Sequence, residues 1–446
     1  MKRFFITGLM LSSVYALAQK TDSIKLRNQL KEEIKQELRA EFEANSKAQI
    51  SQQVNEAVAK DDFLTKIKKI AESNVKISGK GTLRAAEQDW NYEKERDVYA
   101  DDKFWSRISF GVQLDAKIAD GLSFTTRLRS GNQQYGFITF GGISEDRIKV
   151  VFDKYVLKYA KGNYWVSLGR DTQIWEDQKG AQFDVPTHEG LAVGAKFSLD
   201  KDKKTVLEPT AAYYTVRYSG AGAETNGRMW GGQVKLTSTQ EEAKLMGRLG
   251  MIMSDNLQRT GLTGADAVNA GRYYNTNTGS AYDGDLADAY SILTVGASAT
   301  FKNLRGLSIS GEYYQNLRDY DTNPVSYQIT KNTTTGFTPD FTGEKTGYII
   351  TASVGNRGTK GDCQIGASYV YLEKYSTQDF MAQWDHAGWA ASNVKGFEAF
   401  ATYQIFNNLE FRTRFFLAKE IKGYNGNDAD FERSGNRIRF DLNFKF

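Results

Sequence analysis

The chain ends with Asn436-Arg437-Ile438-Arg439-Phe440-Asp441-Leu442-Asn443-Phe444-Lys445-Phe446. Every second residue of this stretch is apolar, and the residues between them are charged or polar. Alternate residues of a β-strand face opposite sides of its sheet, so one side is apolar and the other is charged. That division suits a sheet that lies between lipid and water. About eleven residues is also the length that a tilted strand needs to cross a bilayer.

The same alternation runs through the chain from Val75 onward. Its clearest instance is a hairpin in which residues 108–118 and 122–128 alternate on either side of Asp120-Gly121. Continued to the end, the pattern predicts sixteen strands. Seven connections are short, near residues 120, 162, 202, 240, 304, 358 and 407, and eight are longer and polar. An even number of strands with alternating short and long connections is typical of an outer-membrane barrel, which has brief periplasmic turns and long external loops.

A soluble antiparallel sandwich also alternates, but its connections need not alternate in length. The apolar phase carries no charge in the central parts of the predicted strands, where a charge facing lipid would cost about 2–4 kcal/mol. The mean hydropathy of −0.53 disfavours a helical membrane bundle, whereas strand alternation hides the apolar face of a barrel in the average. Residues 73–446 are therefore predicted to be an all-β transmembrane domain, a 16-stranded antiparallel outer-membrane β-barrel with eight external loops.

The first eighteen residues have the features of a signal peptide for secretion. Lys2 and Arg3 precede an apolar stretch from Phe4 to Tyr15, and Ala16-Leu17-Ala18 supplies the small residues of a cleavage site. Loss of residues 1–18 would remove both basic residues and lower the formal net charge from +4 to +2. The bacterial outer membrane is the predicted location.

Residues 19–72 are predicted to form a periplasmic helical segment. Leu26, Leu30, Ile34, Leu38 and Phe42 recur at four-residue steps in a region rich in Lys, Glu, Gln and Ala. Such a long apolar stripe favours a coiled coil with other copies of the chain, although its spacing is not a strict heptad. The alternative is a helix, or two, folded under the barrel or into its mouth.

Basic residues dominate the face of the predicted strands that points into the barrel. The expected pore-lining residues are Arg107, Lys117, Arg127, Arg129, Lys154, Lys158, Lys196, Lys235, Arg248, Glu312, Arg412, Arg414, Arg437 and Arg439. Basic groups in a pore favour anions, so a mild anion preference is predicted. Several arginines are expected to share one wall, because the last strand adjoins the first on closure. They could instead pair with acids and only stiffen the barrel.

The third long connection, residues 171–188, contains the candidate constriction residues Trp175, Glu176, Asp177 and Asp184. If it folds inward, its acids would face the basic wall and create a transverse field across the pore. The alternative is an ordinary external loop.

Three segments resemble the putative porin family of Gram-negative bacteria: Ile77 to Arg84, the hairpin Arg107 to Gly131, and Tyr155 to Tyr159 with Leu168-Gly169-Arg170. The resemblance spans about residues 75–446 and implies a diffusion pore, often a homotrimer. The final strand also resembles the closing strand of outer-membrane barrels, in which the terminal aromatic residue, here Phe446, is recognised by the barrel assembly machinery. The resemblance does not supply a substrate.

The predicted function is passive diffusion of small hydrophilic solutes through a water-filled channel in outer-membrane lipid. A barrel enzyme is disfavoured because the only histidines, His188 and His386, fall in predicted loops without a nucleophile partner. Two alternatives stay open: a channel specific for an anion such as phosphate, and a tether that joins the membrane to peptidoglycan or another periplasmic component. No motif indicates a cofactor, a metal site or nucleic-acid binding.

Overall fold

The computed structural model describes residues 74–91, 103–130, 138–139, 150–176, 181, 187–216, 219–220, 223–224, 227–255, 289–320, 341–378, 392–422 and 434–446. The predicted signal peptide and the predicted helical segment lie outside these residues. No helix among the described residues has the length and apolar character needed to cross a membrane.

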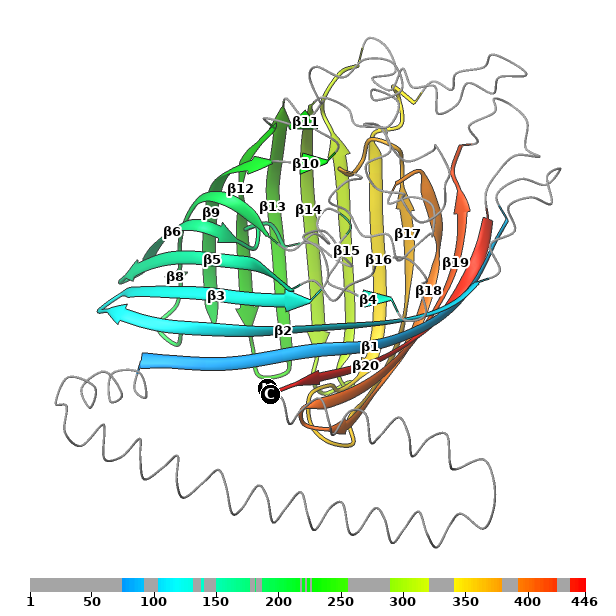
Figure 1. The fold of residues 1–446 in the computed structure, drawn as a ribbon, viewed down its shortest axis with the longest axis horizontal. Helices are drawn as coiled ribbons and strands as arrows, with labels where there is room; N and C mark the ends of the chain where they lie inside the picture. The colour runs from blue at the N-terminus through cyan, green and yellow to red at the C-terminus, as the bar shows by residue number, and fades with distance from the viewer. Residues whose placement is uncertain are drawn as a thin grey trace, which may run out of the picture. The chain divides into compact units, whose positions relative to one another are not determined.

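The described residues form an antiparallel sheet of 18 strands that closes into a barrel, beside a small hairpin of β10 (Ser219–Gly220) and β11 (Ala223–Glu224) (Figure 1). Two strands of the main sheet are only two residues long: β4 (Ile138–Thr139) pairs with β2, and β8 (Phe197–Ser198) pairs with β9. The remaining sixteen confirm the predicted barrel. They are β1 (Val75–Asn91), β2 (Lys103–Ala119), β3 (Leu122–Ser130), β5 (Val150–Lys161), β6 (Tyr164–Asp171), β7 (His188–Ala195), β9 (Thr205–Val216), β12 (Gly227–Thr239), β13 (Ala243–Asp255), β14 (Tyr290–Phe301), β15 (Leu307–Asn316), β16 (Thr346–Gly355), β17 (Cys363–Leu372), β18 (Val394–Phe406), β19 (Leu409–Glu420) and β20 (Ser434–Lys445).

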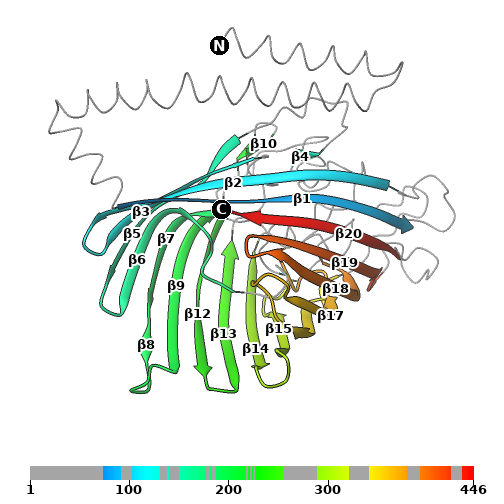
Figure 2. The same cartoon turned by 90° about the horizontal axis from the view of Figure 1, so that it is seen from below.

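The stretch that decides the fold, β20, closes the barrel by pairing with β1 on one side and β19 on the other (Figure 2). Gly79 and Phe446 exchange two backbone hydrogen bonds of 2.9 Å at the end of this seam. A Cβ atom on Gly79 would lie 2.2 Å from the Phe446 ring, and one on Gly81 would lie 2.4 Å from the Phe444 ring. The aromatic rings therefore cover positions of β1 that have no side chain.

The two faces of the barrel wall differ as the alternation requires. Large apolar side chains such as Leu249, Ile350 and Phe397 are exposed on the outer face, while charged side chains such as Arg414 and Asp441 are buried on the inner face. The short connections turn tightly, as at Asp120-Gly121, where Gly121 has a φ of 74°. An L side chain rarely adopts that conformation, which explains the glycine.

The main cluster of buried apolar residues lies inside the barrel, not between two sheets. It includes Tyr214, Ile252 and Tyr314 from inward positions of the strands, packed with Trp175 and Phe341 from the connections. The alternation alone predicts a polar inner face, so this apolar part of the lumen was not foreseen. It exists because segments that connect strands pack onto the inner wall and need an apolar surface there.

Pore lining and candidate constriction

Eight arginines gather on the inner face of adjoining strands and form what we call the basic wall: Arg84, Arg107, Arg127, Arg129, Arg412, Arg414, Arg437 and Arg439. The closure of the barrel brings them together, because it makes β19, β20, β1, β2 and β3 consecutive neighbours in the wall (Figure 2). In the strand register, Arg107 is opposite Arg84, Arg84 is opposite Asp441, and Asp441 is opposite Arg412. Two residues further along β19 and β20, Arg414 and Arg439 are opposite each other.

Three acids each hold two of these arginines. Asp441 Oδ1 lies 2.7 Å from Arg84 Nε, and Asp441 Oδ2 lies 3.0 Å from Arg439 Nη2. Glu398 accepts two hydrogen bonds from Arg414, of 2.6 and 3.0 Å, and lies 3.7 Å from Arg412 Nη2.

The third acid, Asp153, accepts hydrogen bonds of 2.8 and 2.6 Å from Arg127 and lies 3.3 Å from Arg129 Nε. In these ion pairs, the three groups contain six arginines and three acids, so arginines outnumber acids two to one. The acids cross-link arginines of neighbouring strands, which agrees with the stiffening role that the sequence leaves open.

Three other predicted lining residues, Lys117, Lys154 and Lys158, take inward positions in the register of β2, β3 and β5. Lys154 Nζ lies 2.6 Å from Asp171, and Lys158 Nζ lies 4.5 Å from the centre of the Trp165 ring. Lys117 precedes the turn between β2 and β3, and Lys196 is exposed between β7 and β8, so both lie at the rim with the short turns.

Arg248 and Glu312 pair with each other across β14 and are almost wholly buried. Gly296 lies between them in the register, and a Cβ there would be 2.9 Å from Arg248 Nη2. Glycine is required at this position because the ion pair passes directly over it. Glu312 also accepts a hydrogen bond from Tyr314.

The beginning of the predicted constriction segment packs onto the inner wall. Trp175 is 3% exposed, and its indole Nε1–H donates to the carbonyl oxygens of Gly232 and Met251, at 3.2 and 3.1 Å. The ring of Tyr214 packs edge-on against Trp175, with centres 6.0 Å apart. Apolar packing and two hydrogen bonds therefore hold Trp175 on β12 and β13.

Glu176, the next residue, also contacts inward side chains of β12. Its backbone N–H donates to Gln233 Oε1 at 3.1 Å, and its carboxylate lies 2.6 Å from Lys235 Nζ. Lys235 also lies 3.1 Å from Glu208. β12 and β20 are half a turn of the barrel apart in the strand order, so Glu176 is attached to the wall opposite the centre of the basic wall.

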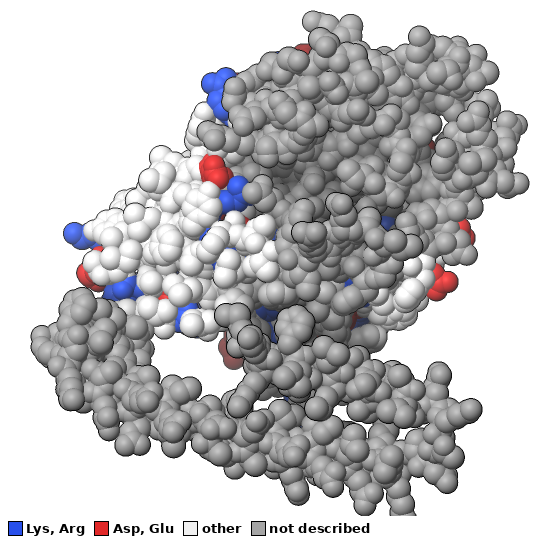
Figure 3. All heavy atoms as spheres, in the orientation of Figure 1, with Lys and Arg blue, Asp and Glu red and all other residues white. Residues whose placement is uncertain are grey.

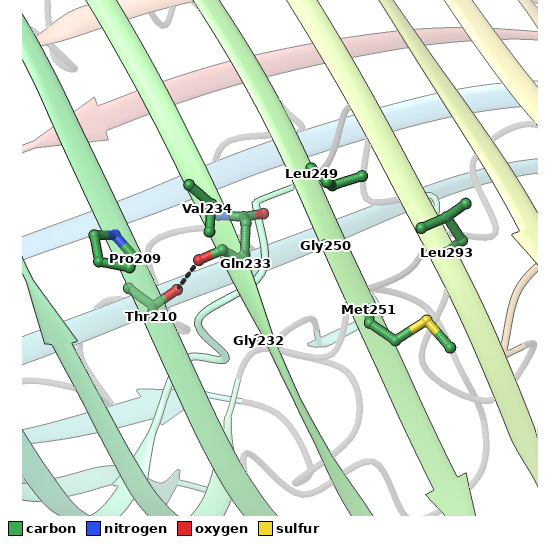
Figure 4. A pocket seen from close by; sticks show the side chains of 9 residues that line it. All are labelled: Pro209, Thr210, Gly232, Gln233, Val234, Leu249, Gly250, Met251 and Leu293. Atoms are coloured by element: carbon green, nitrogen blue, oxygen red, sulfur yellow. Dashed lines mark hydrogen bonds between the residues drawn. The ribbon is translucent and has the colours of Figure 1, made fainter.

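The wall is thin where Trp175 contacts it. Gly231 has a φ of 142°, and a Cβ there would lie 2.1 Å from the carbonyl oxygen of Met251. On the outer face, the absent side chain of Gly232 leaves a shallow recess of about 410 Å³, lined by Pro209, Thr210, Gly232, Gln233, Val234, Leu249, Gly250, Met251 and Leu293 (Figure 4). Gly231 thus leaves room for the indole on the inner face, and Gly232 leaves the recess on the outer face.

Two of the four candidate constriction residues, Asp177 and Asp184, lie outside the described residues, as does His386. The placement of His188 in an external loop was wrong. His188 is the first residue of β7, is 6% exposed, and its ring centre is 5.9 Å from that of Tyr214. Within the described part of the chain, no group of three or more His, Cys, Asp or Glu is placed to hold a metal ion.

Sequence reasoning missed two residues that organise the basic wall. Arg84 follows the same alternation as Lys80 and Thr82, so the pattern of β1 could have revealed it. Asp153 has the parity of the outward Tyr155, but the pairing of β3 with β5 shifts between Arg127 and Leu128, which lets Asp153 face inward. An acid on an otherwise apolar phase is itself a sign of such a bulge.

Charged side chains on the outer wall concentrate toward the ends of the strands. In Figure 3 most of the described surface that faces the viewer is uncharged. Arg170 pairs with Glu189 at 3.5 Å, and Arg228 pairs with Asp255 at 3.0 Å, at the ends of their strands that adjoin the long connections. An uncharged band between charged margins is what a barrel in a bilayer requires.

Comparison with known families decides which class of barrel this is. The family described as Putative porin matches residues 189–446, which is more than half of the chain. The chain belongs to the Putative porin family. The matched residues contain Arg414 of the basic wall, the acids Glu398 and Asp441 that pair with this wall, and Lys235 of the opposite wall. No curated protein sequence matches the chain.

Solved porin structures are similar over most of the chain. Pseudomonas putida OprB, in a high-pH structure, covers 86% of this chain and 97% of its own, with 12% identity and a TM-score of 0.49. Salmonella typhi OmpF, in a complex with daunomycin, covers 84% and 98%, with 12% identity and a TM-score of 0.45. The E1M, A116K mutant of Rh. blastica porin covers 83% and 100%, with 9% identity and a TM-score of 0.42.

Proposed function

We propose that the protein is an outer-membrane porin whose water-filled channel lets small hydrophilic solutes diffuse down their gradients. A barrel of sixteen strands is wide enough to leave an aqueous channel, and membership of the Putative porin family supports the same role. Passive diffusion needs a lumen and a field but no catalytic group, so the proposal is a channel and not an enzyme.

The channel has a mild anion preference. The observation that carries this proposal is the ratio of two arginines to one acid in each of the three groups around Glu398, Asp441 and Asp153. A fixed positive charge beside the path raises the local concentration of anions and lowers that of cations. The preference is mild because the acids cancel half of the arginine charge.

Trp175 and Glu176 narrow the lumen from the side opposite the basic wall. The contacts that support this are the indole hydrogen bonds to β12 and β13 and the salt bridge between Glu176 and Lys235. An acid on one wall and arginines on the other would produce a transverse field that orients dipolar solutes. Asp177 and Asp184 are expected to add to the acidic side.

The location and partners follow from the same proposal. The signal peptide (1–18) would direct export, the helical segment (19–72) would lie in the periplasm as a coiled coil, and the barrel (73–446) would contact outer-membrane lipid. Phe446 would be recognised by the barrel assembly machinery before the seam with β1 closes over it. A homotrimer is the expected assembly, and binding of residues 22–72 to peptidoglycan or another periplasmic component is the alternative use of the helix.

The test is a recording from the purified full chain in a planar bilayer. In a potassium chloride gradient, the expected result is stepwise conductance with a reversal potential displaced a few millivolts toward that of chloride. Absence of conductance from correctly folded protein would refute the channel itself. A reversal potential on the potassium side would refute only the anion preference.

A further inference from the structure

Three arginines of the basic wall and one acid lie in one line across the strand register, which we call the arginine row: Arg107, Arg84, Asp441 and Arg412. They come from four consecutive strands, β2, β1, β20 and β19 (Figure 2). Three of the four side chains are arginines and one is an acid. Neighbouring strands lie about 4.8 Å apart, so Arg84 and Arg412 are about 10 Å apart at their backbones, with Asp441 between them.

Arg412 differs from its neighbour on β19 in how it is held. Arg414 is 3% exposed and makes two short hydrogen bonds to Glu398, whereas Arg412 is 22% exposed and lies 3.7 Å from the same carboxylate. A separation of 3.7 Å is too long for a hydrogen bond. Arg412 therefore contributes charge to the Glu398 group while its guanidinium N–H donors are not used up by that acid.

An aromatic ring fixes the position of this guanidinium. Arg412 Cζ lies 5.3 Å from the centre of the Phe400 ring. A guanidinium near an aromatic face is attracted to it, and that contact uses none of its N–H donors. Because Nε of Arg412 is buried, a planar acceptor would be contacted through the terminal Nη groups. Phe400 therefore acts as a positioning residue for Arg412 beside the path.

We propose that the arginine row binds the carboxylate or phosphate group of a permeating solute, with Arg412 as the residue that contacts it. The inference rests on the proposed channel function and names its class of substrate. The forked guanidinium matches two oxygens of one oxyanion, a geometry that this wall already shows between Arg127 and Asp153, at 2.8 and 2.6 Å. Chloride offers only one acceptor atom, so it cannot form the two parallel hydrogen bonds that two oxygens of an oxyanion accept.

Further basic groups continue from the row toward the short turns. Lys80 is four residues below Arg84 on β1, and Arg129 is at the same level through Gly111. Arg127 is two residues further in the same direction, which places it about 20 Å from the arginine row along the strands, at 3.3 Å per residue. An oxyanion leaving Arg412 thus meets other cations before it leaves the barrel, and a series of weak sites permits passage where one tight site would trap the solute.

The test measures how inorganic phosphate and acetate, added separately, reduce the chloride current of the full chain in planar bilayers. We expect both to compete with chloride in the unmodified protein. Arg412→Gln should raise their half-blocking concentrations by about tenfold, since it removes a charge-assisted hydrogen-bond donor. Arg412→Lys keeps the charge but loses the fork, so it should preserve the chloride reversal potential while weakening the block several-fold.

Arg228→Gln is the matched control, because it removes the same charge from the outer face, where Arg228 pairs with Asp255. Block by phosphate but not acetate, or the reverse, would assign the site to one of the two oxyanions. The inference is wrong, while the porin function stands, if neither salt blocks a conducting channel. It is also wrong if the half-blocking concentrations in Arg412→Gln and Arg412→Lys equal those in Arg228→Gln. A protein that does not conduct at all would overturn the proposed function first.

Discussion

Replacement of Trp175 should release the constriction segment from the wall. Trp175→Ala removes a side chain that is 3% exposed, contacts Tyr214 and donates to two carbonyl oxygens. Truncation of a buried Trp costs about 3–5 kcal/mol. At about 1.4 kcal/mol for each factor of ten, the ratio of attached to released segment would fall by about 10²–10⁴.

The remaining contacts cannot compensate for that loss. The salt bridge between Glu176 and Lys235 joins a carboxylate that is 52% exposed, and exposed ion pairs contribute about 0–1 kcal/mol. Trp175→Phe keeps most of the apolar contact but loses the indole donor, at a cost of about 1 kcal/mol. The two variants should therefore form a graded series.

Single-channel recording is the assay. Trp175→Ala is expected to show higher conductance and larger current noise than the unmodified protein, and Trp175→Phe should show a smaller change in the same direction. Trp230→Phe serves as the control, because Trp230 lies on β12, the strand that Trp175 contacts, with its side chain on the outer face. Equal conductance and equal noise in Trp175→Ala and the unmodified protein would refute the proposed constriction.

Three further changes test other parts of the structure. Gly81→Ala should destabilise the barrel by about 1–3 kcal/mol in thermal unfolding, because its Cβ would lie 2.8 Å from a carbonyl oxygen of β2. Gly247→Ala is the control and should be neutral, because its Cβ would meet nothing within 4 Å. Equal effects of the two substitutions would contradict this account of the seam. Glu398→Gln leaves buried arginine charge uncompensated, so it should cost about 3–5 kcal/mol of stability and increase the anion preference, and an unchanged reversal potential would count against the basic wall. The pKa of Asp200 lies below its ordinary value because the Thr205 side chain and nearby backbone N–H groups donate to its carboxylate. This turn should therefore keep its full stability at pH values above the ordinary Asp pKa and lose it as the pH falls through the lowered pKa. Asp200→Asn should flatten that acid dependence, measured by limited proteolysis at the turn, and an unchanged acid profile would show that another group controls it.

The barrel could be predicted from the sequence because its information is local. Each strand must place apolar side chains outward at every second position, and this period is visible without any knowledge of neighbouring strands. The predicted lining residues that lie in paired strands, from Arg107 on β2 to Arg439 on β20, share the parity of the inner face. The alternation of short and long connections then indicates the order of the strands.

Parity failed where a strand departs from regular pairing. Asp153 lies on the outward phase of its sequence but faces inward, because a bulge adds one residue to β5 opposite β3. A bulge leaves only a weak local signal, since one charged residue out of phase can also mark the end of a strand. The apolar patch inside the lumen was missed for a related reason: Tyr214 and Ile252 read as ordinary strand residues until the packing of Trp175 against that wall is known.

The sequence by itself determined the fold class and which residues of a regular strand face inward, because these depend on residue type and a period of two. Only the tertiary structure decided which arginines meet which acids, where Trp175 attaches, and that Arg84 and Arg412 lie two strands apart although 328 positions separate their numbers. Those relations depend on ring closure and on register between strands distant in the sequence. Closure is a property of the whole sheet, and no single strand contains it.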